Sequence, residues 1–134
     1  MESIPGKRSA ELSIALAKAL ISALQAGVTG WRRAYVRFQA SDGFSEVKGS
    51  YVTPEGVSIF NVVKYKPLFA QLRQFGLELR DDLARSGARK FCLFLLQVDS
   101  SFQWKIDYEW NDPTRWKITK MDGGSGLPDG GAES

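Results

Sequence analysis

Residues 91–110 read FCLFLLQVDSSFQWKIDYEW, and this stretch carries the strongest fold signal in the chain. Its first part, residues 91–98, is apolar at nearly every position, which is typical of an inner strand that is covered on both faces. A turn of Asp99, Ser100 and Ser101 follows. Residues 102–110 then alternate regularly, with aromatic and aliphatic side chains on one face and polar side chains on the other. The stretch therefore predicts two adjacent strands joined by a turn.

The sequence before this stretch predicts two helices and three strands. Leucines spaced four residues apart predict a first helix, which Ser9 can cap and which runs to about Ala26. Pro67 suits the first turn of a second helix, which ends near Ser86. Alternating side chains and turn residues predict the three strands, at residues 31–40, 44–51 and 57–63.

These elements follow the order α-β-β-β-α-β-β. Strands joined by hairpins, then a helix and a strand pair, predict an α+β domain with a mainly antiparallel five-stranded sheet packed by two main helices. A length of 134 residues suits one domain, which we expect to occupy residues 1–122. Residues 123–134 are rich in Gly, Ser, Pro and Asp, and this composition predicts a flexible tail.

The composition excludes several kinds of chemistry. The chain contains no histidine, which removes Ser-His-Asp and Cys-His catalysis as well as histidine metal sites. The single cysteine, Cys92, lies in an apolar run and is interpreted as a buried, inert thiol. One cysteine permits neither an intrachain disulfide nor a thiolate cluster, which fits a reducing cytoplasm. We therefore expect a protein that is not an enzyme and needs no cofactor or metal.

Targeting signals are also not expected. The residues from Met1 to Pro5 lack the basic leader and apolar core of a signal peptide. We find no apolar run that approaches the roughly 18 residues needed to cross a bilayer. The sequence thus predicts a soluble cytoplasmic protein with no membrane partner.

Charge is divided unevenly along the chain. Residues 1–98 carry 14 basic and 8 acidic groups, a net charge of +6, whereas residues 99–134 carry 4 basic and 7 acidic groups, a net charge of −3. Three of these acids, Asp107, Glu109 and Asp112, crowd the end of the last predicted strand. Paired carboxylates can serve acid–base catalysis or hold Mg²⁺. The same pattern is that of a solvated strand face, or of a patch that meets a basic partner.

The tryptophans near the C-terminus fall into two groups. Alternation places Trp104 and Trp110 with Phe102 on one strand face, which favours the core. Trp116 follows the turn at Pro113 and lies outside the alternation, so it is a candidate interface anchor.

A second candidate surface is a basic and aromatic stripe on the strand predicted at residues 31–40. Its members are Trp31, Arg33, Tyr35 and Arg37. Some sheets bind RNA in this way, with aromatic rings that stack on bases and arginines that hold phosphates. Covering by a helix, or snorkelling of the arginine side chains, explains the same pattern.

The run from Phe102 to Pro113, FQWKIDYEWNDP, followed by Arg115-Trp116-Lys117, resembles the C-terminal signature of YezG-like bacterial immunity proteins. Residues 30–36, GWRRAYV, are similar to the first strand of that family, which follows an N-terminal helix. The resemblance covers residues 9–118 in element order. Proteins of this family accompany the toxic C-terminal domains of polymorphic and contact-dependent growth-inhibition toxins.

The resemblance implies an antitoxin that binds a cognate toxin domain and blocks its active site or substrate groove. Such a protein works by binding, so tight affinity and fast association are expected, and complementary charge speeds association. Many immunity proteins against nucleases are acidic, whereas this chain has a net charge of +3. The alternative is a module that binds single-stranded nucleic acid through the basic and aromatic stripe.

The predicted toxin interface consists of the acidic strand end and the tryptophan that follows it. Its members are Asp107, Glu109, Asp112 and Trp116. Changing Asp107 and Glu109 together to lysine is expected to weaken protection and the salt dependence of association. The second choice is the stripe of Trp31, Arg33, Tyr35 and Arg37.

Overall fold

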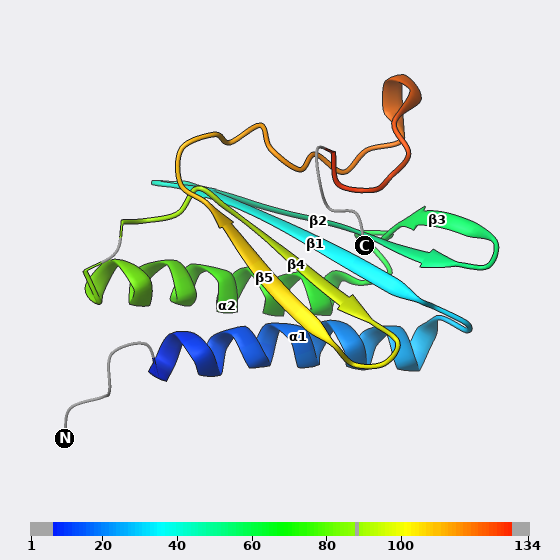
Figure 1. The fold of residues 1–134 in the computed structure, drawn as a ribbon, viewed down its shortest axis with the longest axis horizontal. Helices are drawn as coiled ribbons and strands as arrows, with labels where there is room; N and C mark the ends of the chain where they lie inside the picture. The colour runs from blue at the N-terminus through cyan, green and yellow to red at the C-terminus, as the bar shows by residue number, and fades with distance from the viewer. Residues whose placement is uncertain (1–6, 88, 130–134) are drawn as a thin grey trace.

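The computed structural model describes residues 7–87 and 89–129. These residues form two long helices and a five-stranded antiparallel sheet, in the predicted order α-β-β-β-α-β-β (Figure 1). The predicted α+β class is therefore confirmed. The elements are α1 (Lys7–Gly27), β1 (Arg33–Ser41), β2 (Phe44–Thr53), β3 (Gly56–Ile59), α2 (Lys66–Arg85), β4 (Leu93–Asp99), β5 (Trp104–Glu109) and a short 3₁₀ helix (Met121–Gly123).

The strands lie in the spatial order β3-β2-β1-β4-β5, and each pairs with its neighbours in antiparallel fashion. The apolar run at residues 91–98 supplies β4, which lies between β1 and β5 and is covered on both faces, as predicted. The two edges of the sheet are β3 and β5. The third strand is shorter than predicted because a turn begins after Ile59, where Asn61 Oδ1 accepts backbone hydrogen bonds from Val63 and Lys64.

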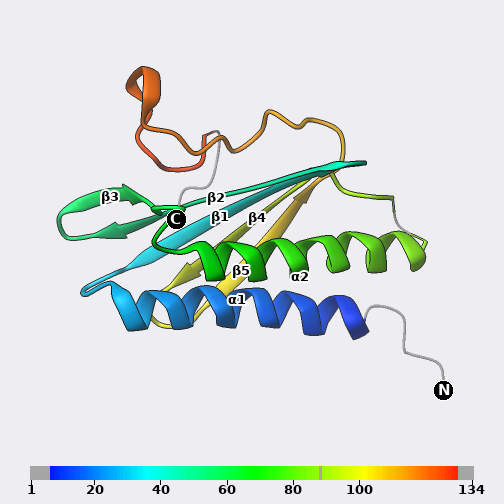
Figure 2. The same ribbon diagram turned by 180° about the vertical axis from the view of Figure 1, so that it is seen from behind.

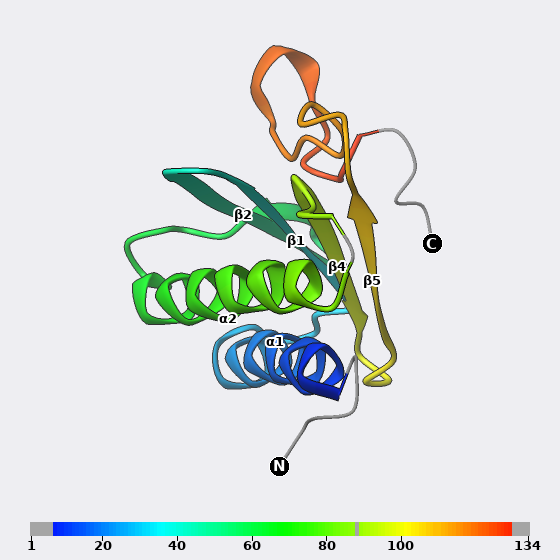
Figure 3. The ribbon, with the colours of Figure 1, turned by 90° about the vertical axis from the view of Figure 1, so that its left-hand side faces the viewer.

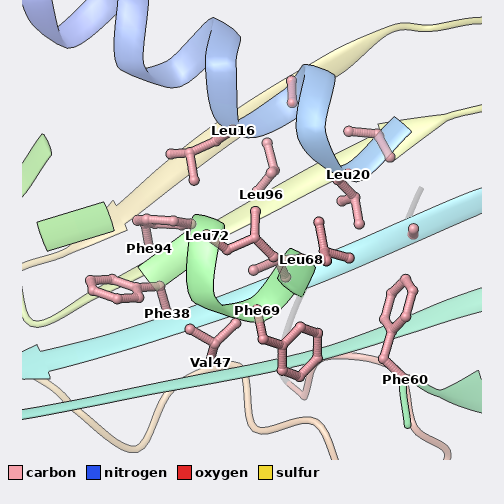
Figure 4. Packing of buried hydrophobic residues seen from close by; sticks show 14 of the residues in the cluster. Leu16, Leu20, Phe38, Val47, Phe60, Leu68, Phe69, Leu72, Phe94 and Leu96 are labelled. Carbon is pink, nitrogen blue, oxygen red and sulfur yellow. The ribbon is translucent and has the colours of Figure 1, made fainter. Parts of the chain in front are cut away.

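Both helices pack on one face of the sheet, and the C-terminal segment of residues 111–129 crosses the opposite face (Figures 1 and 2). An end-on view shows the sheet between these two layers (Figure 3). The main core fills the space between helices and sheet, where Leu16 and Leu20 of α1 meet Phe94 and Leu96 of β4 (Figure 4). We call the side of the sheet that the helices cover the helix face, and the opposite side the far face.

Helix α1 begins two residues before its predicted cap. Ser9 therefore lies inside the first turn, where its hydroxyl donates a hydrogen bond to Asp82 Oδ2 of α2 at 2.6 Å. The prediction of a capping role was wrong because the partner of this serine lies on another helix, 73 residues away in sequence.

Helix α1 also corrects the expectation that no apolar run approaches the length of a membrane span. Of the helices in the described residues, it alone is long and apolar enough, with a mean hydropathy of 1.2. Its leucines at positions 12, 16, 20 and 24 are at most 2% exposed, because they pack in the main core. The leucines form the buried stripe of an amphipathic helix, and 33% of its most apolar window is buried in the domain.

A second, smaller core lies on the far face. Trp116 and Ile118 of the C-terminal segment pack there against Tyr35, Leu93 and Leu95 of the sheet. The Gly126 N–H donates to the Thr119 carbonyl at 2.9 Å, and the Asp129 N–H donates to the Lys117 carbonyl at 3.0 Å. The predicted flexible tail is thus corrected for residues 123–129, which fold back against the segment; residues 130–134 lie outside the described residues.

Candidate functional site

The residues of the basic and aromatic stripe lie in different places, because some belong to the main core and others to the small core on the far face. Tyr35 is 1% exposed and packs in the small core on the far face. Trp31 precedes β1 and belongs instead to the main core on the helix face. The C-terminal segment covers Arg37, whose Nε donates to the Arg115 carbonyl at 2.8 Å and whose Nη2 donates to the Pro113 carbonyl at 2.6 Å. The predicted open face therefore does not exist, and only Arg33 of the four remains partly exposed.

Two of the predicted interface acids build the loop that follows β5. Glu109 Oε1 accepts a hydrogen bond from Arg115 Nη1 at 2.7 Å, and Oε2 accepts from the backbone N–H groups of Asn111 and Asp112 at 3.0 and 3.1 Å. The Arg115 contact and then the two N–H groups lower the pKa of Glu109 to about 2. Asp112 Oδ1 accepts from the hydroxyl and backbone N–H of Thr114, which lowers the pKa of Asp112. Both carboxylates are thus engaged in local structure.

Trp116 is a core residue, so its predicted role as an exposed anchor is corrected. Its side chain is 4% exposed in the small core of the far face, and the Arg115 guanidinium lies 4.5 Å from its ring centroid. The helices occupy the other side of the sheet, so the far-face side chains of β4, Leu93 and Leu95, need a different apolar cover. Trp116 and Ile118 provide it.

Asp107 is the predicted acid that stays accessible. It lies opposite Leu95 on the far face of β5, and its side chain is 49% exposed. Its carboxylate is 3.7 Å from the ammonium group of Lys105, two residues earlier on the same face. An exposed ion pair of this length contributes little to stability, so both charged groups remain available to a partner.

Next to Lys105 the far face opens into a pocket of about 240 Å³. Its walls come from β1, β4, β5 and the hairpin between the last two, and none of them comes from the C-terminal segment. The lining residues are Arg33, Tyr35, Gln97, Val98, Asp99, Gln103, Trp104 and Lys105.

The pocket presents positive charge that is only weakly compensated. Within residues 7–87 and 89–129, no carboxylate lies within ion-pair distance of Arg33. Asp99 stands opposite Arg33 across the β1–β4 ladder, but its Oδ1 accepts hydrogen bonds from the backbone N–H groups of Ser101 and Gln103 at 2.9 and 3.0 Å. Within the described part of the chain, the donors of the Arg33 guanidinium are therefore available to a ligand or a partner surface.

The hairpin beside this pocket exposes aromatic side chains. Phe102 is 53% exposed and has a φ of 67°, and Trp104 is 38% exposed. The prediction that Trp104 lies in the core was wrong, because this side chain is at the first residue of β5 and stays partly exposed; Phe102, which shares its predicted face, lies in the turn before the strand. Trp110, at the other end, is partly buried and packs edge-on against Phe91 with a centroid distance of 6.4 Å.

Sequence reasoning identified Arg33 and missed the rest of this pocket. Gln97 carried a usable signal, because it is the one polar side chain in the otherwise apolar run at residues 91–98. It lies opposite Tyr35 and next to Lys105, where the far face is no longer covered. A polar residue inside a strand that is buried elsewhere marks the place where one face of that strand meets solvent.

Among the residues that the structure describes, the cysteine and the acidic side chains do not add a nucleophile or a metal cluster to this pocket. Cys92 lies outside the pocket, half-buried, with its Sγ 3.4 Å from the Glu109 carbonyl, and burial raises the pKa of its thiol. Across the described part of the chain, no group of three or more Cys, Asp and Glu residues is placed to hold a metal ion.

The fold and this surface define a small α+β domain with two helices on one face of the sheet and a half-covered face of mixed charge on the other. A scan against models of known protein families and a search of curated proteins find no match to the chain.

Proposed function

We propose that this protein is an immunity-type inhibitor that binds a bacterial toxin domain and neutralises it without a chemical step of its own. The observation that carries the proposal is the exposed surface around the β4–β5 hairpin. There Phe102 is exposed in the turn that leads into an open pocket, and Arg33, which makes no ion pair within the described residues, lines that pocket. Aromatic residues and arginine dominate the energetics of protein interfaces, and an exposed aromatic patch beside free charges is typical of a docking site.

The resemblance of residues 102–113 and the order of the elements support the same proposal. The structure alters the expected chemistry of the interface, because Glu109 and Asp112 are committed to the 109–116 loop. The accessible groups are Arg33, Lys105 and Asp107, which carry both signs of charge. We therefore propose a toxin surface that is itself of mixed charge, in place of a uniformly basic one.

The nucleic-acid alternative loses the surface on which it depended. Base stacking would need Tyr35 and phosphate binding would need Arg37, and the C-terminal segment covers both side chains. No other observation on this molecule favours that function over protein binding.

The test is co-expression with the toxin domain encoded beside this gene, scored by cell survival and by co-purification. Wild-type protein is expected to protect the cells and to co-purify with the toxin in a one-to-one complex. Arg33→Glu should weaken binding about 30-fold, the loss that corresponds to a hot spot of about 2 kcal/mol. Because Glu109 holds a loop, its substitution would test folding as well as binding.

The matched control is Arg73→Glu on the exposed face of α2, far from the pocket. It makes the same change of charge and should leave protection and affinity unaltered. Circular dichroism and thermal unfolding of both variants show whether each is folded. Failure of the wild type to protect or bind would refute the proposal, and an Arg33→Glu variant that binds like the control would place the interface elsewhere.

A further inference from the structure

The outer edge of β5 is free in the described part of the chain. The strand is last in the sheet order, and among the described residues it pairs only with β4. An unpaired edge presents a row of backbone N–H and C=O groups that a further strand can pair with. Pairing at this edge goes beyond the function proposed above; it engages Lys105 and Asp107, two of the accessible charges named there, but its test needs no toxin.

The hydrogen-bond pattern identifies which backbone groups point outward. The Asp99 N–H donates to the Gln103 carbonyl at 3.0 Å, so residue 103 faces β4. In an antiparallel ladder the direction alternates from one residue to the next. Residues 105, 107 and 109 therefore bond to β4, whereas Trp104, Ile106 and Tyr108 direct their backbone groups away from the sheet.

We propose that the partner of this edge is a second copy of the same chain, paired β5 to β5 about a two-fold axis at Ile106. In this register Ile106 lies opposite Ile106, and Trp104 of each copy lies opposite Tyr108 of the other. All outward backbone groups of residues 104, 106 and 108 then meet outward groups of the second strand. The two sheets join into one continuous antiparallel sheet.

Side-chain charge selects the same register. With the axis at Ile106, Lys105 of each copy lies opposite Asp107 of the other on the far face. Both side chains are exposed, by 62% and 49%, and their contact within one strand is a weak 3.7 Å pair. Opposite charges across a strand pair stabilise it, and like charges destabilise it.

The neighbouring registers are disfavoured for the same reason. A slip of two residues in one direction places Lys105 opposite Lys105, and a slip in the other direction places Asp107 opposite Asp107. In the second of these slips Lys105 would lie opposite Glu109, whose carboxylate is already held by Arg115 at 2.7 Å. A slip of one residue places the outward-facing backbone groups of one strand opposite backbone groups of the other strand that already bond to β4. It also exchanges the two faces of the sheet. Of these registers, the one centred on Ile106 keeps the hydrogen bonds and pairs each Lys105 with an accessible Asp107.

The helix face next to this edge is apolar and incompletely covered. Trp104 is 38% exposed there, and Tyr108 lies beside Ser13 of α1. The residue after Ser13, Ile14, is 42% exposed. A second copy paired at β5 places its own Trp104, Tyr108 and Ile14 on the other side of the two-fold axis. The strand pair and these apolar side chains next to α1 then form one interface.

The test is the molar mass of the full chain across a dilution series, measured by sedimentation and by light scattering after size exclusion. Lys105→Asp and Asp107→Lys each place like charges opposite one another twice in the dimer, and each should raise its dissociation constant at least tenfold. The double variant Lys105→Asp/Asp107→Lys exchanges the charges and should restore the dimer. Lys18→Asp, on the flank of α1 that faces α2, is the matched control and should have no effect.

Hydrogen exchange gives a second readout that is independent of the substitutions. In the dimer the amides of Ile106 and Tyr108 should exchange as slowly as that of Asp107, whereas in a monomer only the Asp107 amide is protected. A wild type that stays monomeric throughout the series would overturn the proposal. It is equally overturned by a dimer that both single variants leave intact, or by a double variant that fails to recover although it is folded.

Discussion

Replacing Arg37 with methionine should loosen the C-terminal segment from the sheet. Arg37 is 4% exposed, and it donates hydrogen bonds to the carbonyls of Pro113 and Arg115 at 2.6 and 2.8 Å. A further N–H reaches Gln39 Oε1 at 3.1 Å. Arg37 is thus the polar contact that joins β1 to the loop between β5 and the small core on the far face.

The size of the effect follows from these contacts. A hydrogen bond that involves a charged group contributes about 1.5–3 kcal/mol. Two effects offset part of this loss. Methionine removes the desolvation penalty of a buried charge, a penalty that also lowers the pKa of Arg37. In the variant, the carbonyls of the exposed residues 113 and 115 can bond to water. We therefore expect the free energy of unfolding to fall by about 2–4 kcal/mol, less than the sum of the separate bonds.

The assay is urea unfolding followed by tryptophan fluorescence, with Arg33→Met as the control. Arg33 lies on the same strand and the same face but makes no ion pair within the described residues, so its substitution should change stability by less than about 0.5 kcal/mol. Hydrogen exchange should accelerate first at the amides of Gly126 and Asp129, which are bonded within the segment. Equal losses for the two variants, or unchanged exchange at these amides, would refute the role of Arg37.

Two further predictions concern the loop after β5 and the packing of α2. The lowered pKa of Glu109, about 2, means that its carboxylate stabilises the fold above its ordinary pKa near 4.5 and that this stabilisation is lost as the pH falls toward 2. Melting temperatures of wild type and Glu109→Gln should therefore differ at neutral pH and converge between pH 4.5 and 2; parallel curves would contradict this. Gly76→Ala gains about 1 kcal/mol in helix propensity, but its Cβ would lie 2.9 Å from the fully buried ring of Phe38. We expect a net loss of about 1–3 kcal/mol in denaturant unfolding, partly relieved by adding Phe38→Leu, and a stabilised Gly76→Ala variant would show that the ring can move.

Most of the architecture follows from local patterns in the sequence. Alternation at residues 31–40 and 102–110 and the apolar run at residues 91–98 identify three strands, and the turns between neighbouring strands make their pairing antiparallel. These signals suffice for the β1–β2, β2–β3 and β4–β5 pairs because hairpin pairing joins segments that are close in sequence. The central β1–β4 pair joins strands that β2, β3 and α2 separate in the chain, and no turn in the sequence indicates it. The capping role assigned to Ser9 failed for the opposite reason, since its partner, Asp82, is on a distant helix.

The site was harder to predict because alternation tells which side of a strand a residue occupies and not what covers that side. Glu109 and Asp112 look like free acids in the sequence, but short polar side chains in a turn bond to nearby backbone groups, as both do here. Trp116 follows a Pro-containing turn. A residue at such a position can lie in an exposed loop or in a segment that folds back onto the sheet, and the sequence does not distinguish the two. The composition of residues 123–129 is typical of a linker, although its glycines also permit the tight return of the chain against Lys117 and Thr119.

Arg33 and Arg37 show how the covering segment determines the proposed function. They lie four residues apart on one face of β1, with Tyr35 between them, and are equivalent in any analysis of periodicity. One is held under the C-terminal segment by backbone carbonyls, and the other borders the open pocket. The extent of the segment over the sheet therefore decides which arginine can meet a partner. If the proposed interface is correct, Arg37→Met should impair toxin binding only to the degree that it disorders the segment, whereas Arg33→Glu should impair binding in a protein that is fully folded.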